Sequence, residues 1–131
     1  MTVAASPKSE SIIDIDQALT FTGGDPEMLL SVAELFSEEG PLQLQAIGQS
    51  IDDVDAAGIQ RTAHQLKGSV VIFGADRTAK AALDVEMMAR SGDLSEISNA
   101  WMALQSEMKK LFAELKELPD RLASSNEDQI K

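Results

Sequence analysis

The chain of 131 residues contains no cysteine, no tyrosine and a single histidine, His64. Without cysteine it has no disulfide, no thiolate metal site and no cysteine nucleophile, and one histidine supplies too few ligands for a zinc site. We therefore expect no metal site and no cofactor of its own. Because a chain without cysteine is compatible with a reducing compartment, we expect a cytoplasmic protein.

Long apolar runs and clustered basic residues are also missing from the sequence. We therefore predict no membrane-spanning segment and no contact with a membrane. The chain has 22 acidic and 11 basic residues and a net charge of −11. A nucleic-acid partner is not expected, because phosphate backbones require clustered positive charge. No catalytic triad, zinc-binding helix or glycine-rich phosphate loop is present, so the common enzyme classes find no support.

The few basic residues are unevenly placed along the chain. Residues 11–60 contain no lysine or arginine, whereas residues 61–80 contain four basic residues and one acidic residue, Asp76. The single histidine lies inside this locally positive window. The window therefore favours an anionic ligand group near His64.

Apolar residues recur at helical spacing along most of the chain, and no alternating strand pattern competes with them. The most regular stripe steps by four and three before Pro119, through Ile97, Trp101, Leu104, Met108, Leu111, Leu115 and Leu118. Such a stripe is typical of a helix in a bundle. We predict an all-α fold, an antiparallel up-down-up-down four-helix bundle with a short extra N-terminal helix.

Capping residues predict where these helices begin and end. Asp25 followed by proline predicts a helix start at about residue 26, with a kink or short break at residues 40–41. Gly74 and Gly92 are expected to terminate helices, and Asp76 to cap the helix between them, which runs to about residue 90. Ile12, Ile13, Ile15 and Leu19 are assigned to the short N-terminal helix.

One domain is expected from a chain of this length. We place the bundle at residues 11–118, between a flexible N-terminus at residues 1–10 and a polar C-terminal tail at residues 119–131. Pro119 is expected to end the last helix, because proline cannot donate the next helical hydrogen bond.

The histidine lies on a predicted helix, whose apolar stripe is Ile59, Ala63, Leu66, Val70 and Phe73. At about 100° per residue, His64 projects about 140° from the centre of that stripe and so points away from the core. Lys67 and Gly68 lie within about 60° of His64 on the same face. A nucleophilic imidazole, a cation and an open glycine surface are what a phosphate relay requires.

These residues also match a known family. The run HQLKGS at residues 64–69, followed by FGA at 73–75 and then by Leu83 and Glu86, resembles the histidine-containing phosphotransfer (HPt) domain of multistep two-component phosphorelays. The resemblance extends over residues 14–118. It implies that His64 accepts a phosphoryl group from an aspartyl phosphate, that Lys67 stabilises the phosphate, and that Gly68 gives the partner access.

The resemblance also implies the partners. They are the receiver domains of a hybrid sensor histidine kinase and of a response regulator, between which the phosphoryl group passes. Because the transition state is loose and needs mainly alignment and a nearby cation, the chain requires no base or nucleotide loop. The magnesium ion is expected in the receiver. We therefore expect a monomeric phosphohistidine carrier without kinase activity of its own.

Other residues near the histidine have two interpretations. Glu86 lies within the stripe Ala79, Leu83 and Met87, and many relatives carry glutamine there. It either faces His64, where orientation of the imidazole competes with repulsion of the phosphate, or it has no role at the site and reaches solvent or forms an i,i+4 pair with Arg90. Ser69 is either a hydroxyl near the phosphate or merely a small polar residue. Gln60 and Val71, an apolar side chain expected to be exposed, are candidates for docking a partner.

An alternative function belongs to another class. The chain is then a helical-bundle interaction module that is never phosphorylated. Such a module would tolerate replacement of His64 with glutamine, whereas a relay would stop.

Overall fold

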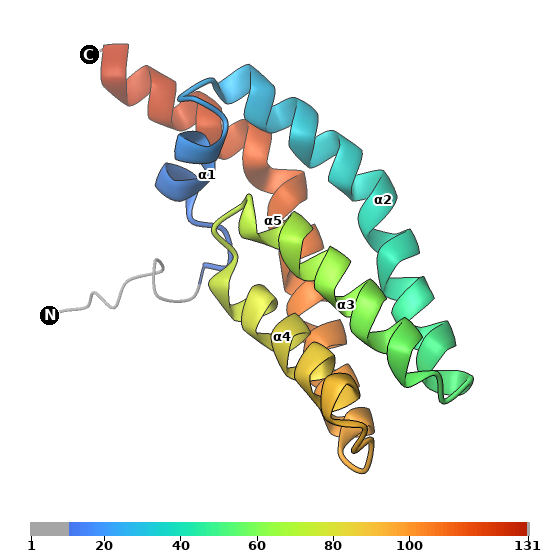
Figure 1. The fold of residues 1–131 in the computed structure, drawn as a ribbon. Helices are drawn as coiled ribbons and strands as arrows, with labels where there is room; N and C mark the ends of the chain where they lie inside the picture. Colours follow the sequence, from blue (N-terminus) through green and yellow to red (C-terminus); the bar gives the residue numbers. More distant parts are fainter. Residues whose placement is uncertain (1–10, 131) are drawn as a thin grey trace, which may run out of the picture.

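The computed structural model of the chain describes the backbone of residues 11–130 and the side chains of residues 11–124. Its helices are α1 (Ile15–Phe21), α2 (Pro26–Asp52), α3 (Ala56–Val71), α4 (Asp76–Ser91) and α5 (Ile97–Ile130). Helices α2 and α4 each pack against α3 and α5, so the four long helices form a closed antiparallel bundle (Figure 1). The predicted all-α fold with a short N-terminal helix is confirmed. No strand occurs within residues 11–130.

The core is built from the apolar stripes that the sequence predicts. All five stripe residues of the histidine helix, from Ile59 to Phe73, are fully buried. On α5 the stripe from Leu104 to Leu118 is buried as well, and Trp101 is half-buried against it. The centroids of the Phe36 and Phe73 rings lie 5.5 Å apart, so α2 packs against the turn that follows α3. These contacts fix the orientation of α3 and therefore the direction of the helix face opposite the core, on which His64 lies.

Aspartate side chains cap the helices that lead to that face. The Asp25 carboxylate accepts hydrogen bonds from the backbone N–H groups of Glu27 and Met28, and α2 begins at Pro26 as predicted. Asp55 accepts a hydrogen bond from the Gly58 N–H at the start of α3. Each cap satisfies donors that a helix N-terminus otherwise leaves unpaired.

Two predicted helix boundaries are corrected. The short break, one of the two alternatives predicted at residues 40–41, does not occur: helix α2 is continuous through Pro41, and Phe36 and Ile47 on either side of the proline are both held in the core. Asp76 is the first residue of α4 and not its cap. Gly74, at φ +63°, turns the chain so that the Asp76 N–H donates to the Gly74 carbonyl, which leaves Ala75 in the capping position.

The prediction that Pro119 ends the last helix is wrong. Helix α5 continues to Ile130, so residues 119–130 are not a tail separate from it. A proline inside a helix costs about 3 kcal/mol. Leu118 and Leu122 are buried on either side of Pro119. Across the proline, a guanidinium nitrogen of Arg121 lies 3.4 Å from a carboxylate oxygen of Glu114, about two helical turns earlier. Packing of these residues offsets the lost hydrogen bond, and the expected boundary at residue 118 falls within a helix.

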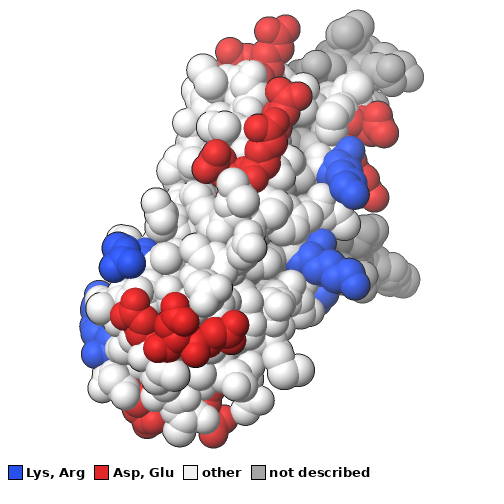
Figure 2. All heavy atoms as spheres, turned by 90° about the vertical axis from the view of Figure 1, so that its right-hand side faces the viewer, with Lys and Arg blue, Asp and Glu red and all other residues white. Residues whose placement is uncertain are grey.

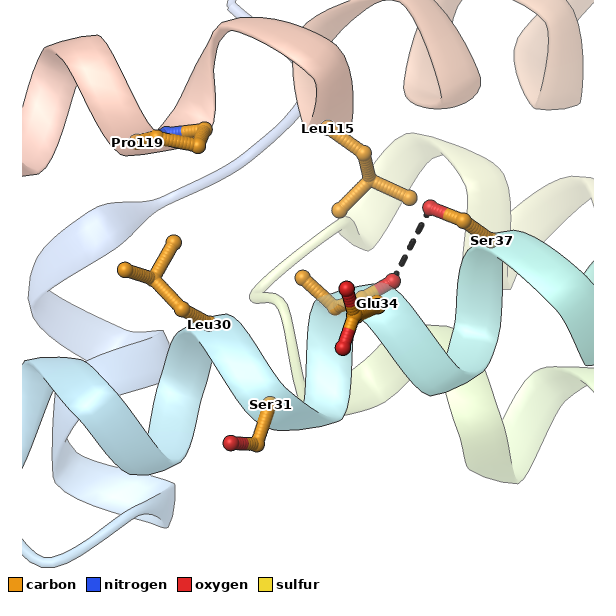
Figure 3. A pocket seen from close by; sticks show the side chains of 7 residues that line it. Leu30, Ser31, Glu34, Ser37, Leu115 and Pro119 are labelled. Carbon is orange, nitrogen blue, oxygen red and sulfur yellow. Dashed lines mark hydrogen bonds between the residues drawn. The ribbon is translucent and has the colours of Figure 1, made fainter.

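A surface pocket of about 260 Å³ lies where α5 passes Pro119. Figure 3 shows Leu115 and Pro119 of α5 facing Leu30 of α2, with Ser31, Glu34 and Ser37 around the opening. The Ser37 hydroxyl donates to the Ala33 carbonyl on its own helix. None of the candidate residues near His64 lines this pocket.

The N-terminal segment differs in part from its prediction. Helix α1 begins at Ile15, and Ile12 and Ile13 precede it in a non-helical segment that is nevertheless buried. We call residues 11–13 the N-terminal strap. The flexible terminus predicted at residues 1–10 lies outside the described residues. Among the helices described, none combines the length and apolar character needed to cross a membrane.

Candidate functional site

The candidate site lies on the outer face of α3, where His64 is well exposed. Its side chain is 66% exposed, while Ala63 and Leu66 on the inner face are fully buried. The predicted orientation away from the core is therefore confirmed. Because the helix backbone is fixed by its buried stripe, the ring is presented from a rigid element.

A buried carboxylate on α4 contacts one nitrogen of the ring. The Glu86 Oε2 atom lies 2.9 Å from His64 Nδ1, and the Glu86 side chain is 4% exposed. An ionised carboxylate only accepts hydrogen bonds, so Nδ1 carries the proton and donates it to Oε2. In the neutral ring the lone pair is then on Nε2. No hydrogen bond from the described residues occupies Nε2.

Two cations share the same carboxylate. Lys67 Nζ lies 3.2 Å from Oε1 of Glu86, and an Arg90 guanidinium nitrogen lies 3.6 Å from Oε2. The Lys67 contact is an ion pair without hydrogen-bond geometry. Glu86 therefore contacts His64 and pairs with Arg90 at the same time. Only the i,i+4 spacing on α4 signalled Arg90 in the sequence.

The buried face of α4 differs from the predicted one. Met87 is exposed, and the face turned inward is formed by Thr78, Ala81, Ala82, Val85, Glu86 and Ala89.

Burial alone would raise the pKa of the Glu86 carboxyl. The Lys67 ammonium and the His64 ring outweigh burial and hold the pKa of Glu86 below its ordinary value. Glu86 is therefore ionised at neutral pH.

Gly68 adds open space beside the ring. A methyl group built on its Cα would contact no atom within 4 Å. Elsewhere in the bundle, glycine is needed for packing, since a methyl group at Gly40 would meet the Phe112 ring at 2.9 Å and one at Gly48 would meet Trp101 at 3.0 Å. The fold itself gives no reason for glycine at position 68.

The remaining candidates, Gln60, Ser69 and Val71, form no hydrogen bond with the ring. The Ser69 hydroxyl donates to the Gln65 carbonyl at 3.3 Å on its own helix, which agrees with a small polar residue. Gln60 is half-buried. Val71 is also half-buried and not exposed as predicted, because it lies in the last turn of α3 next to the turn into α4.

Charges are segregated over the surface. On the face shown in Figure 2, acidic side chains gather in groups and basic side chains lie toward the edges. The basic cluster at the site, Lys67 and Arg90, comes from α3 and α4. Among the side chains described, those of residues 11–124, there is no group of three histidine, cysteine, aspartate or glutamate residues that would hold a metal ion.

The Glu86 contacts predict a pH-dependent contribution to stability. A carboxyl whose pKa is lowered by folding stabilises the native state above its ordinary pKa of 4.5, and this stabilisation is lost as the pH falls through the lower native value. We expect the unfolding free energy of the wild type to fall relative to that of Glu86→Gln as the pH drops below about 4.5. Urea unfolding at several pH values measures it. A difference that does not change down to pH 3 would contradict the assignment.

Comparison with known proteins agrees with this geometry. A family model described as the Hpt domain matches residues 31–124. Histidine-containing phosphotransfer protein B (HptB) from Pseudomonas aeruginosa PAO1 has a similar fold, with a TM-score of 0.77, 19% sequence identity, and coverage of 84% of this chain and 96% of that chain. A search of curated proteins found no match. Hpt domains interact with the receiver domains of response regulators. The chain belongs to the Hpt domain family and has a histidine-phosphotransfer role in two-component phosphorelay signalling.

Proposed function

We propose that Nε2 of His64 is the atom that accepts the phosphoryl group from a receiver aspartyl phosphate and passes it to a second receiver. The observation that supports this proposal is the contact between the exposed His64 ring and buried Glu86. Because Glu86 accepts the proton of Nδ1, the lone pair of Nε2 is left as the nucleophile. Because His64 is the only histidine of the chain, a phosphohistidine on it has a single location.

The neighbours of His64 are assigned supporting roles. Lys67 is 27% exposed and already lies at the site, so its ammonium needs only a side-chain rotation to reach a phosphoryl oxygen. During transfer, negative charge is spread over the equatorial oxygens of the phosphoryl group, and a nearby cation neutralises it. Gly68 leaves the approach to the ring open, and Gln60 and Val71 flank it as docking residues. Ser69 is given no contact with the phosphate, since its hydroxyl is used within α3.

The partners and setting follow from this role. We propose that the receivers belong to a hybrid sensor histidine kinase and to a response regulator, and that the chain works as a cytoplasmic monomer. It has no kinase activity in this proposal, because the receiver supplies the activated phosphoryl group and the magnesium ion.

Replacement of His64 with glutamine is expected to abolish phosphorylation. The experiment incubates the purified chain with several phosphorylated receiver domains and measures the mass gain and the stability of the bond. We expect an acid-labile, alkali-stable phosphate on the wild type and none on His64→Gln, with unchanged helicity. Phosphate retained on the variant would place the acceptor elsewhere. No phosphate from any receiver would favour the unphosphorylated interaction module.

A further inference from the structure

The charge of Glu86, beyond its ability to accept a hydrogen bond, has a consequence for the chemistry of His64. A glutamine side chain also presents an oxygen to Nδ1, so orientation of the ring does not require a carboxylate. The groups that face Glu86 are His64 and Lys67 from α3 and Arg90 from its own helix. Within the described residues, no ion pair reaches it from α1, α2 or α5. The negative charge therefore acts on the ring and on these two cations.

We propose that Glu86 keeps the proton on Nδ1 while the phosphoryl group is on Nε2, so that the phosphorylated ring remains a phosphoimidazolium. This inference rests on the proposed phosphorylation of His64. Glu86 is a positioning residue in it, because it acts through the ring and does not touch the phosphoryl group.

The transfer step balances without any external proton donor. The Nε2 lone pair attacks the phosphorus of the aspartyl phosphate, the P–O bond breaks, and its electron pair stays on the aspartate carboxylate. The ring gains a positive charge and retains the Nδ1 proton against Glu86. In the onward step a carboxylate oxygen of the second receiver attacks phosphorus, and the P–N electron pair returns to Nε2. The leaving group is then neutral imidazole.

Loss of the Nδ1 proton would slow the onward step. The leaving group would become an imidazolate anion, which is a much stronger base and therefore a poorer leaving group. An opposite charge within about 4–6 Å shifts the pKa of a group by about 1–3 in the direction that favours its charged form. Because the Glu86 carboxylate lies 2.9 Å from Nδ1 and is almost fully buried, its effect on the ring is only weakly screened. The phosphorylated ring should keep its proton to higher pH than with glutamine.

Repulsion of the phosphoryl group by the carboxylate does not cancel this effect. Glu86 contacts the ring nitrogen that is not phosphorylated, so the ring separates the two negative groups. Lys67 and Arg90 contribute two positive charges against the one of Glu86. The site therefore stays attractive to an anion while the proton is retained.

The test compares the wild type with Glu86→Gln, which keeps the hydrogen-bond acceptor and removes the charge. The matched control is Asp84→Asn, which makes the same change of charge on the same helix, at a residue that pairs with Lys80 and not with the ring. Each chain is phosphorylated with phosphoramidate, the reagent is removed, and the decay of phosphohistidine is followed by ³¹P NMR from pH 6 to pH 10.

The decay rate of phosphohistidine should fall as the pH rises and Nδ1 loses its proton. We expect this fall to occur about one pH unit lower in Glu86→Gln than in the wild type. At pH values between the two transitions the variant should therefore decay about tenfold more slowly. Asp84→Asn should follow the wild type. In ¹⁵N NMR the phosphorylated wild type should show a protonated Nδ1 at pH 8. Coincident profiles for the wild type and Glu86→Gln would overturn the proposal, as would an unprotonated Nδ1 in the wild type, whatever the variants do. A wild type that takes no phosphoryl group on His64 would instead overturn the proposed function.

Discussion

Phosphoryl transfer from a receiver should fall at least about a hundredfold when Gly68 is replaced with glutamine, although the fold becomes more stable. The free molecule has room for the new side chain, since no atom lies within 4 Å of a methyl group built at this position. Glycine within a helix costs about 1 kcal/mol relative to a good helix former, and glutamine recovers most of it. The loss arises in the complex, where displacement of the reacting atoms by about 1 Å costs about a hundredfold in rate.

Two controls separate access from chemistry in this prediction. Gly68→Ala adds a single methyl group and should fall between the wild type and Gly68→Gln in transfer from a receiver. Phosphoramidate is small and needs no docking surface, so it should phosphorylate all three chains at similar rates. Undiminished transfer from a receiver to Gly68→Gln would mean that the partner does not pass over this residue.

The largest loss of stability outside the apolar core is expected for Glu114→Ala. The Glu114 carboxylate on α5 accepts hydrogen bonds from the backbone N–H groups of Ile12 at 2.7 Å and Ile13 at 2.9 Å, and from the Ser11 hydroxyl at 3.1 Å. Both isoleucines are buried, so their N–H groups lose their partner in the variant. Hydrogen bonds to a charged group contribute about 1.5–3 kcal/mol, and unpaired buried donors cost about 1–3 kcal/mol each. We expect a loss of about 3 kcal/mol.

Urea unfolding at neutral pH measures this loss. Glu117→Ala is the matched control, because Glu117 is exposed on the same helix and should change the unfolding free energy by less than about 0.5 kcal/mol. Glu114→Gln retains one acceptor oxygen and should lie between the two. Equal stability of Glu114→Ala and Glu117→Ala would show that the hydrogen bonds from the N-terminal strap to Glu114 contribute nothing to stability.

Local patterns predicted the parts of the fold that depend on neighbouring residues. The buried stripe around His64, the cap at Asp25 and the exposed position of the ring all follow from spacing of three and four residues and from capping chemistry. The continuation of α5 past Pro119 does not follow, because the cost of a proline is local whereas the burial of Leu118 and Leu122 depends on the assembled bundle.

The candidate site divides in the same way. His64, Lys67 and Gly68 share one helix face, so the sequence was sufficient to bring them together. Glu86 comes from another helix, and the expected stripe of Ala79, Leu83 and Met87 misplaced the buried face of α4. The sequence therefore does not determine the position of Glu86 against His64, which depends on how α3 packs on α4. Glu114 carried no signal at all, because its backbone partners lie about 100 residues away.

That separation has a kinetic consequence for the N-terminal strap. Ile12 and Glu114 are 102 positions apart, and directly after the strap the Asp14 N–H donates to the carbonyl of Phe73, in the turn that follows α3. Contacts of such high sequence separation cannot form before the elements they join are in place. The strap should therefore dock last during folding and open first in local fluctuations, with faster amide hydrogen exchange at Ile12 and Ile13 than in α3. The segment of the bundle that is synthesised first is then the last to reach its native position.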